Sequence, residues 1–499
     1  MSYLLRDSTA TIVHIDDEVI RASVGVGELF SPPTVHAMVF PYNPSAIESA
    51  GSTTEEGKQN WLVGNTLENV TSVTGWEEKV ELRWPFVSEQ GKKDDWEGRE
   101  VLLLHLYSLL GIKISQNTSP LLLIPPASPP VLPLPVQALY TQLAFERLNV
   151  PGFSLLPSPL ATLFALGATT GLVLHVGRKS SSAWVVVDSV VRWDACASIP
   201  VGQEDCEIAF LRLLMSDEKL EQELRSVIGE ERFNTEGKEK YVKEVCQVVW
   251  KECLTDDIEI PVAGGGKGFV VGPTEEEEEE QFDVARKLVG DTSGPSHSHK
   301  SKKQQAAIAQ AAQAAATKAA AEAQLAAEQA AALDFISLTI PSIPDKEISL
   351  GSVRHKICEP LLHSVDMGSE TIWEGMGRAV NSPGLSMKER VDVWEAVGVV
   401  GDMARIKSFP PALVTYLAPF LLSSAELPSD IQPGHVRLLH IPDYFSNYKG
   451  STLDVAPFLG GCMVSRLAFG DVAGKHAITK VDYNARGPSA IYTVGNEGR

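Results

Sequence analysis

The chain has 499 residues, of which 44% are hydrophobic and 21% are charged. This balance is typical of a globular protein, and the length allows two or more sizeable cores. The formal net charge of -21 at pH 7 argues against direct binding of duplex nucleic acid, because that binding depends on Lys and Arg neutralising phosphates. A basic protein partner suits this surface better.

No targeting or anchoring segment is expected. No apolar signal core follows Met1, and prolines interrupt the apolar stretch at 121–134, so no run reaches the roughly 18 apolar residues that a membrane-spanning helix needs. We expect free thiols in a reducing compartment, because no C-x-x-C pair occurs among the six cysteines, which are Cys196, Cys206, Cys246, Cys253, Cys358 and Cys462.

Short β-rich runs alternate with helical stretches between residue 10 and about residue 254. Such alternation predicts an α/β architecture. The runs and stretches occupy residues 11–15, 120–124, 136–148, 158–167, 172–176 and 183–187.

The composition changes abruptly at residues 261–332. This segment holds the acidic run 275–280, a Ser/His/Lys-rich stretch at 293–303 and an alanine-rich tract. It cannot bury enough apolar surface to offset the entropy of ordering, so we predict a disordered or transiently helical insertion. The acidic run is either a contact for basic protein tails or a solvated spacer. His297 and His299 lack the further ligands of a closed metal site, and no metal is expected.

Several segments resemble actin, in consistent order over nearly the whole chain. The clearest is Thr-Thr-Gly-Leu-Val-Leu at 169–174, which is similar to the strand entering actin's second phosphate loop. The stretch at 343–361 is similar to the family's "LPDG…I.IG…R..CPE.LF", although the glycine after Asp345 is missing. Further matches lie at 145–151, 458–462, 478–483 and 487–491.

This resemblance implies an α/β fold of the actin/hexokinase type, in which two lobes enclose a central nucleotide cleft. The small lobe is expected at 1–165 and is completed by 455–499. The large lobe is expected at 166–260 and 333–454, with the long low-complexity insertion at 261–332 between its two parts.

The first loop of the cleft predicts a degenerate nucleotide site. Phosphate loops need small residues whose backbone N–H groups can approach the phosphates. Here Asp16, Asp17 and Glu18 stand where the family has mainly small residues. They place like charge beside a polyphosphate.

The second loop departs from the family in the same direction. The family's two aspartates are replaced by His175 and Arg178, on either side of Gly177, and neither replacement supplies the hard oxygen ligands that Mg²⁺ prefers. Ser158 stands at the position of the water-orienting glutamine, and Gly401 lies where the family reads "GGT" near the adenosine. We therefore expect no catalytic residue, no metal and no cofactor.

Two interpretations of the basic residues remain open. Arg21, Arg178 and Lys179 could hold ATP without hydrolysing it, because Arg and Lys bind phosphate well. Alternatively, the three carboxylates of the first loop pair with Arg178 and Lys179 across the cleft. His175 has no identifiable nucleophile or orienting carboxylate in the sequence, which favours a structural role.

The resemblance also implies a groove that accepts an amphipathic partner helix. The spacing of Met463, Val464 and Leu467 after Leu459 fits one face of a helix. Ordinary core packing is the alternative for each residue. The groove residues carried over from the family are Phe164, Gly167, Thr169, Leu459, Met463, Val464 and Leu467.

Within the superfamily, the segments at 25–33 and 441–445 and the insertion are similar to nuclear actin-related proteins of fungal SWI/SNF and RSC chromatin remodellers. That subfamily implies a non-enzymatic structural subunit in the nucleus. Its partners would be the helicase-SANT-associated helix of the remodeller ATPase subunit and a second actin-related protein, bound as a heterodimer.

Two other classes are weighed against this one. A cytoskeletal scaffold such as the pointed-end actin-related subunit of dynactin is distinguished by a cytoplasmic location. An active ATPase of the superfamily needs a Gly-rich first loop and metal-organising carboxylates, which this sequence lacks.

Overall fold

The computed structural model describes most of the chain outside the insertion. Three features of the sequence lie outside the described residues, namely Glu18, the segment 26–33 and the insertion at 261–332. The described ranges are 10–17, 19–25, 35–37, 40–42, 61–64, 67, 81–87, 94–229, 235–260, 334–364, 370–421, 433–448, 453–470 and 476–493.

The chain divides into two compact units. Unit 1 comprises Met1–Arg212, Glu252–Ile260 and Ile357–Arg499, and unit 2 comprises Leu213–Lys251 and Pro261–Lys356.

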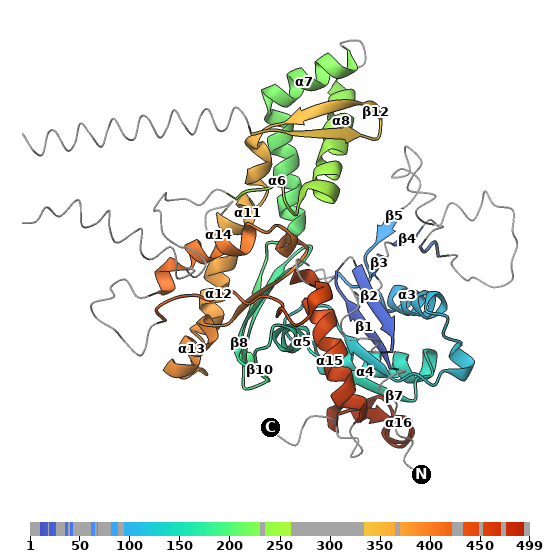
Figure 1. The fold of residues 1–499 in the computed structure, drawn as a ribbon. Helices are drawn as coiled ribbons and strands as arrows, with labels where there is room; N and C mark the ends of the chain where they lie inside the picture. The colour runs from blue at the N-terminus through green and yellow to red at the C-terminus, as the bar shows by residue number, and fades with distance from the viewer. Residues whose placement is uncertain are drawn as a thin grey trace, which may run out of the picture. The chain divides into compact units, whose positions relative to one another are not determined.

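A six-stranded mixed sheet forms the first half of unit 1 (Figure 1). Its two central strands β1 and β6 are parallel and are buried along their whole length, as expected for strands that are covered on both faces. In spatial order the strands are β14 (Ile478–Thr479), β7 (Gly152–Leu155), β6 (Leu121–Ile124), β1 (Thr11–Ile15), β2 (Val19–Val24) and β3 (Val35–Ala37).

A four-stranded sheet forms the second half of unit 1. Here β8 is the central strand, with an antiparallel hairpin partner β9 on one side and the parallel strand β13 on the other. The same arrangement surrounds β1 in the first sheet, where β2 is antiparallel and β6 is parallel. In spatial order the strands are β10 (Val190–Ile199), β9 (Ser181–Val187), β8 (Gly171–Val176) and β13 (Val397–Gly401).

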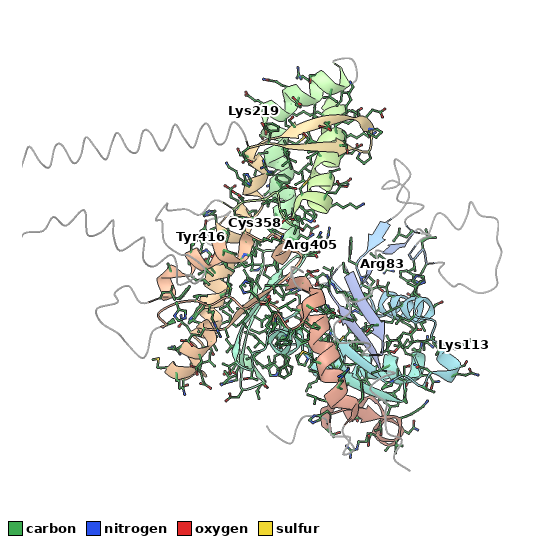
Figure 2. The ribbon with its side chains drawn as sticks, viewed as in Figure 1. Arg83, Lys113, Lys219, Cys358, Arg405 and Tyr416 are labelled. Atoms are coloured by element: carbon green, nitrogen blue, oxygen red, sulfur yellow. The ribbon has the colours of Figure 1, made fainter. Side chains whose placement is uncertain are left out.

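Helices cover the outer faces of both sheets, so each half is an α/β sandwich. On the first sheet α3 (Trp96–Leu109) and α4 (Leu134–Gln142) share a core cluster with β1, β6 and β7. On the second sheet α12 (Ile372–Val380) packs against β9 and β10, and α13 (Met387–Trp394) against β8 and β9. Side chains fill the space between these layers (Figure 2).

Two helices join the sheets on their inner faces. α15 (Ala456–Gly470) packs against β1 and β6, and α5 (Ser158–Ala165) packs against the strands of the second sheet. The two helices also pack closely against each other. Their contact depends on Gly460, where an added Cβ would lie 1.8 Å from the carbonyl oxygen of Ala161.

α15 contradicts the expectation that no run is long and apolar enough to span a membrane. The segment Leu453–Gly470 has the length and composition of a membrane-crossing helix, but 61% of it is buried inside the fold. Its contacts with α5, β1 and β6 are those of a core helix.

Unit 2 is a small helix and hairpin assembly. The helices α7 (Glu218–Ile228) and α8 (Thr235–Val248) pack against the antiparallel hairpin of β11 (Ile336–Ile340) and β12 (Ile343–Leu350). The hydroxyl of Ser342 in the hairpin turn donates to Glu244 of α8 at 2.6 Å.

The remaining elements connect these layers. They are the strands β4 (Phe40–Tyr42) and β5 (Glu81–Arg83), the helices α6 (Gln203–Ser216), α11 (Glu359–Leu362), α14 (Phe409–Tyr416) and α16 (Lys480–Arg486), the π-helical turns η4 (Leu143–Arg147) and η5 (Val249–Cys253), and the 3-10 helices η3 (Ile114–Gln116), η6 (Ser352–Lys356), η7 (Asp402–Arg405), η8 (Ala418–Phe420), η9 (Ser446–Tyr448), η10 (Leu453–Val455) and η11 (Gly487–Thr493).

The expected α/β architecture is confirmed. Each run or stretch singled out in the sequence corresponds to a strand or helix within a few residues, and the stretch at 136–148 forms α4 together with η4. The boundaries of the two compact units differ from those of the expected lobes, because both large sheets belong to unit 1. The lobe boundaries themselves remain a prediction.

The close approach of α5 and α15 generates a stability prediction. Gly460→Ala forces a methyl group against the Ala161 backbone, so we expect it to lower the free energy of unfolding by about 1–3 kcal/mol. Gly470→Ala, at the end of the same helix, is the control, because an added Cβ there meets nothing within 4 Å. Urea denaturation of both variants checks this, and equal stabilities would contradict the role given to Gly460.

Candidate functional site

The loop after β1 forms a tight hairpin that turns two carboxylates inward. The backbone N–H of Asp16 donates to the carbonyl of Val19 at 2.9 Å, which closes the turn into β2. The carboxylate of Asp16 in turn accepts the N–H of Asp17 at 2.9 Å. Both acidic side chains are therefore fixed by the turn, and both residues are at least 91% buried, with exposures of 9% and 8%.

Asp16 joins the two sheets through a histidine. Its Oδ1 lies 2.9 Å from Nε2 of His175, which is on β8 in the second sheet. Both side chains are buried. The sequence offered no orienting carboxylate for His175, and the structure supplies one in Asp16, 159 positions earlier in the chain.

Arg21 extends this contact into a network. It lies on β2, and its guanidinium donates to Asp454 at 2.6 Å, while its Nη1 lies 3.7 Å from Oδ2 of Asp16. Asp454 belongs to η10, directly before α15. The four buried side chains Asp16, Arg21, His175 and Asp454 are called the cleft network below.

Asp17 holds the second loop through its backbone. Its Oδ2 accepts the N–H of Arg178 at 2.7 Å. The contact requires glycine at position 177, where an added Cβ would lie 2.6 Å from the same carboxylate oxygen. The loops after β1 and β8 are thereby interlocked.

Pairing of the loop carboxylates with the side chains of Arg178 and Lys179 is one of the two open interpretations. Neither Asp16 nor Asp17 lies within ion-pair distance of these side chains, although the charge of Arg178 acts to lower the pKa of Asp17. The guanidinium of Arg178 stacks 4.6 Å from the ring of Trp84 and lies 4.0 Å from Glu207. Lys179 lies 3.8 Å from Glu204.

The reason is the position of α6. The backbone N–H groups of Gln203 and Glu204 donate to the carbonyls of Gly177 and Arg178 at 2.9 and 2.8 Å. The first turns of α6 therefore lie against this loop and offer Glu204 and Glu207 to its two cations. Glu18, the third expected partner, lies outside the described residues.

Burial and charge act in opposite directions on the titration of this cluster. Burial is the largest influence on Asp16 and raises its pKa, but His175, His14 and Arg21 together hold the pKa below its ordinary value. Burial has the opposite effect on His175 and lowers its pKa. The charges of Asp16 and Asp17 outweigh burial, so the pKa of His175 is raised above its ordinary value. Both members of the central pair therefore favour their charged forms.

The neighbouring groups respond mainly to burial. It raises the pKa of Asp17 to about 6 and the pKa of Asp402 to about 6, and it lowers the pKa of His14 to about 3. His14 is thus neutral near pH 7.

These contacts do not fit the magnesium nucleotide that the fold family implies. Phosphate loops receive phosphate oxygens on backbone N–H groups, but here the N–H groups of Asp17 and Arg178 donate to carboxylates of the chain itself. Arg21 is likewise engaged by carboxylates. Among the described residues, no group of three or more His, Cys, Asp or Glu is placed to hold a metal ion.

The two remaining cleft residues have structural surroundings. Gly401 ends β13 with φ +98°, and an added Cβ would lie 2.2 Å from the carbonyl of Val176, so it is needed for strand packing. Ser158 is buried at the start of α5 and lines a pocket of about 190 Å³.

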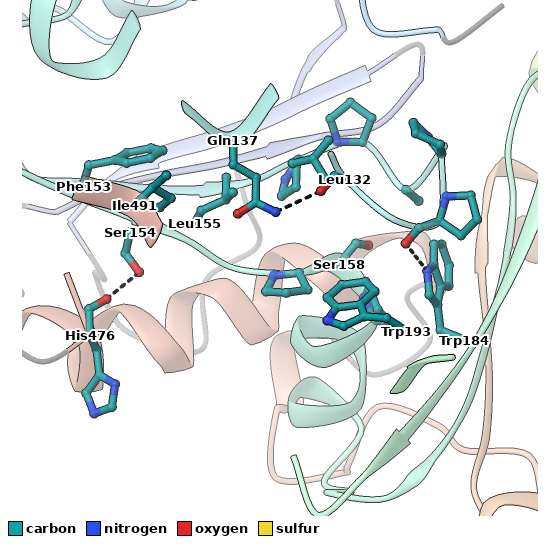
Figure 3. A pocket seen from close by; sticks show the side chains of 17 residues that line it. Leu132, Gln137, Phe153, Ser154, Leu155, Ser158, Trp184, Trp193, His476 and Ile491 are labelled. Atoms are coloured by element: carbon teal, nitrogen blue, oxygen red, sulfur yellow. Dashed lines mark hydrogen bonds between the residues drawn. The ribbon is translucent and has the colours of Figure 1, made fainter. Parts of the chain in front are cut away.

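That pocket is lined mostly by prolines and aromatic side chains (Figure 3). Two of its polar donors bond within the wall, because Trp184 donates to the Pro130 carbonyl at 2.8 Å and Gln137 donates to the Leu132 carbonyl at 2.9 Å. No residue of the cleft network lines it.

The residues of the expected helix groove differ widely in exposure. Leu459 is fully buried in the core with Leu163 and Leu166, so its assignment to the groove is corrected in favour of core packing. Leu467 is 70% exposed on α15. Phe164, Met463 and Val464 are half-buried, and Gly167 and Thr169 are exposed.

The sequence analysis missed several residues around these sites. Asp454 is far from the recognisable loops, and no local pattern marks it as a partner of Arg21. Near the groove, Tyr444 is 61% exposed and its hydroxyl lies 3.9 Å from the Cβ position of Gly167. The sequence could have indicated Tyr444, because it lies in the segment 441–445 that resembles the subfamily.

Comparisons with known proteins agree with this architecture. A protein-family profile described as Actin matches residues 40–251. The SWI/SNF and RSC complexes subunit arp9 of Schizosaccharomyces pombe is 24% identical over 543 residues, which cover 98% of this chain and 99% of that protein.

Two further relatives match shorter stretches. Actin-related protein 7 of Saccharomyces cerevisiae is 23% identical over 37% of this chain and 38% of its own length. An actin-like protein of Neurospora crassa is 32% identical over 25% of this chain and 32% of its own length.

The raised pKa of His175 predicts a pH dependence of stability. A histidine whose pKa rises on folding stabilises the folded state below its unfolded pKa of about 6.5, and that contribution is lost as the pH rises through the folded value. His175→Gln removes the titrating imidazole. We therefore expect the free energy of unfolding of the wild type to exceed that of the variant most near pH 6 and least near pH 9. Urea denaturation across this range checks it. A stability difference that does not change with pH would contradict the assignment.

Proposed function

Because this chain belongs to the actin-related proteins of the actin superfamily, we propose that it is a non-catalytic structural subunit of a nuclear chromatin-remodelling complex of the SWI/SNF or RSC type. The main support for this proposal is the similarity of the chain to arp9 over nearly the full length of both proteins. A fold alone does not determine function, which depends on the chemistry of its sites.

The cleft supports a role without ATP hydrolysis. Hydrolysis needs oxygen ligands for the metal ion and a positioned water. His175 and Arg178 stand in place of the metal-organising carboxylates, and Ser158 is buried at the position of the water-orienting side chain. The donors of both loops bind carboxylates of the chain itself. ATP is not expected as a cofactor.

The groove between α5 and α15 supports a partner helix. Met463, Val464 and Leu467 lie at helical spacing on α15, and Phe164 is on the neighbouring helix α5. One exposed and three half-buried apolar side chains at such a place suit an amphipathic helix that presents its own apolar face. The proposed occupant is the helicase-SANT-associated helix of a remodeller ATPase subunit, shared with a second actin-related protein.

Charge is consistent with that occupant. The chain has a formal net charge of -21, which would steer a helix rich in Lys and Arg toward it. The net charge also disfavours direct contact with DNA.

Absence of turnover is the first test of the proposal. Purified protein is expected to release no phosphate from Mg²⁺-ATP above background, because no group of three or more His, Cys, Asp or Glu among the described residues is placed to hold a metal ion. His175→Ala is the matched control for trace contaminants. Turnover in the wild type that the His175 substitution abolishes would overturn the non-catalytic assignment.

Partner binding is the second test. Because interface energy concentrates in a few anchors, Leu467→Asp should weaken binding of the helix by about 2 kcal/mol or more, with little change in melting temperature because Leu467 is 70% exposed. Val481→Asp is the control, since Val481 is equally exposed, at 76%, on α16. Titration calorimetry with the helix peptide checks this. Equal binding by both variants would move the interface elsewhere.

A further inference from the structure

We propose that Arg21 is a positioning residue for the partner groove: the cleft network replaces a bound nucleotide as the element that fixes the two sheets, and so preforms the groove. This inference rests on the proposed function for the identity of the occupant. The residues of the proposed groove and of the cleft network all lie in unit 1.

The network crosses between the sheets at more than one place. Asp16, in the turn after β1, binds His175 on β8 at 2.9 Å. Arg21 on β2 binds Asp454 of η10 at 2.6 Å, and η10 itself packs against β13 and η7. All four side chains are buried. The chain's own side chains therefore place opposite charges on both sides of the junction between the two sheets.

The same contacts set the start of α15. Asp454 stands two residues before Ala456, the first residue of α15, so the Arg21 ion pair anchors that end of the helix. Further along, Gly460 meets the backbone of Ala161 on α5. The groove residues Met463 and Leu467 follow one to two turns later. An anchored start and a close contact together determine where those residues lie relative to α5.

The groove therefore depends on how the two sheets are held. One wall is on α15, which packs on the first sheet, and the other is on α5, which packs on the second. A change in the angle between the sheets moves the two walls apart. Buried ion pairs add little net stability, because desolvation offsets their attraction, but their partners and geometry are specific. That property suits a positioning role.

The experiment separates positioning from simple stabilisation. Arg21→Met leaves Asp454 buried without the Arg21 cation, while Asp16 keeps His175. Arg21→Met combined with Asp454→Leu removes the whole pair, a change that buried pairs often tolerate. Arg378→Met is the matched control, because it breaks the pair with Glu370, whose contact is 2.7 Å long but exposed. Arg21→Lys keeps the charge but cannot reach both carboxylates with a fork.

Two quantities are measured on each folded variant. One is the affinity for the helicase-SANT-associated helix peptide, and the other is hydrogen exchange of the α15 amides in the free protein. We expect the double variant to regain most of the wild-type melting temperature and still bind about tenfold more weakly, which lies within the usual range of coupling between sites. Its α15 amides should exchange faster than those of wild type and of Arg378→Met.

The outcomes are distinguishable. Wild-type affinity together with wild-type exchange in the double variant would overturn the proposal, because the network would then only stabilise. If wild type itself fails to bind the peptide, the proposed function fails, and the exchange comparison alone decides whether the network positions α15. If neither Arg21→Met variant folds, Arg21→Lys replaces them, with intermediate affinity and exchange expected and wild-type values contradicting the role.

Discussion

The hydrogen bond between Asp16 and His175 is the contact on which the junction of the two sheets depends. A buried charge must find an opposite charge, because an unpaired one is very costly. Asp16 is satisfied by His175 from the second sheet and by Arg21 from its own. Arg21 in turn needs Asp454. Each group in the cluster thus requires the next, and the requirement continues until both sheets and the start of α15 are included.

This constraint changes the chemistry available to the loops. In a nucleotide-binding cleft the loop N–H groups must remain available for phosphate oxygens. Here the two acidic residues of the first loop accept those N–H groups, one from Asp17 and one from Arg178. The same side chains that break the family's glycine-rich pattern also satisfy the donors that the pattern normally reserves for the ligand.

The relatives place these observations in a wider setting. Similarity to arp9 covers 98% of this chain, although only 24% of the aligned residues are identical. The helices α5 and α15 pack on the sheets and on each other, while Leu467 of α15 stays exposed.

The sequence by itself determined the elements and the positions at which the two loops depart from the actin pattern. Buried apolar runs such as β1 and β6 are visible without a structure, because a strand covered on both faces must be apolar throughout. The charged residues in the first loop and the missing aspartates of the second are equally plain in the sequence. These features depend on local composition and on the resemblance to actin.

Only the tertiary structure decided which charges meet. Arg21 and Asp454 are 433 positions apart, and their pairing depends on how the sheets dock, which no local pattern encodes. The packing of α6 against the second loop likewise brings Glu207 to Arg178 and Glu204 to Lys179, two contacts that the sequence did not predict. The spacing of α15 gave the correct helix but not the burial of Leu459, since periodicity defines a face and only the neighbouring helix determines how much of that face it covers.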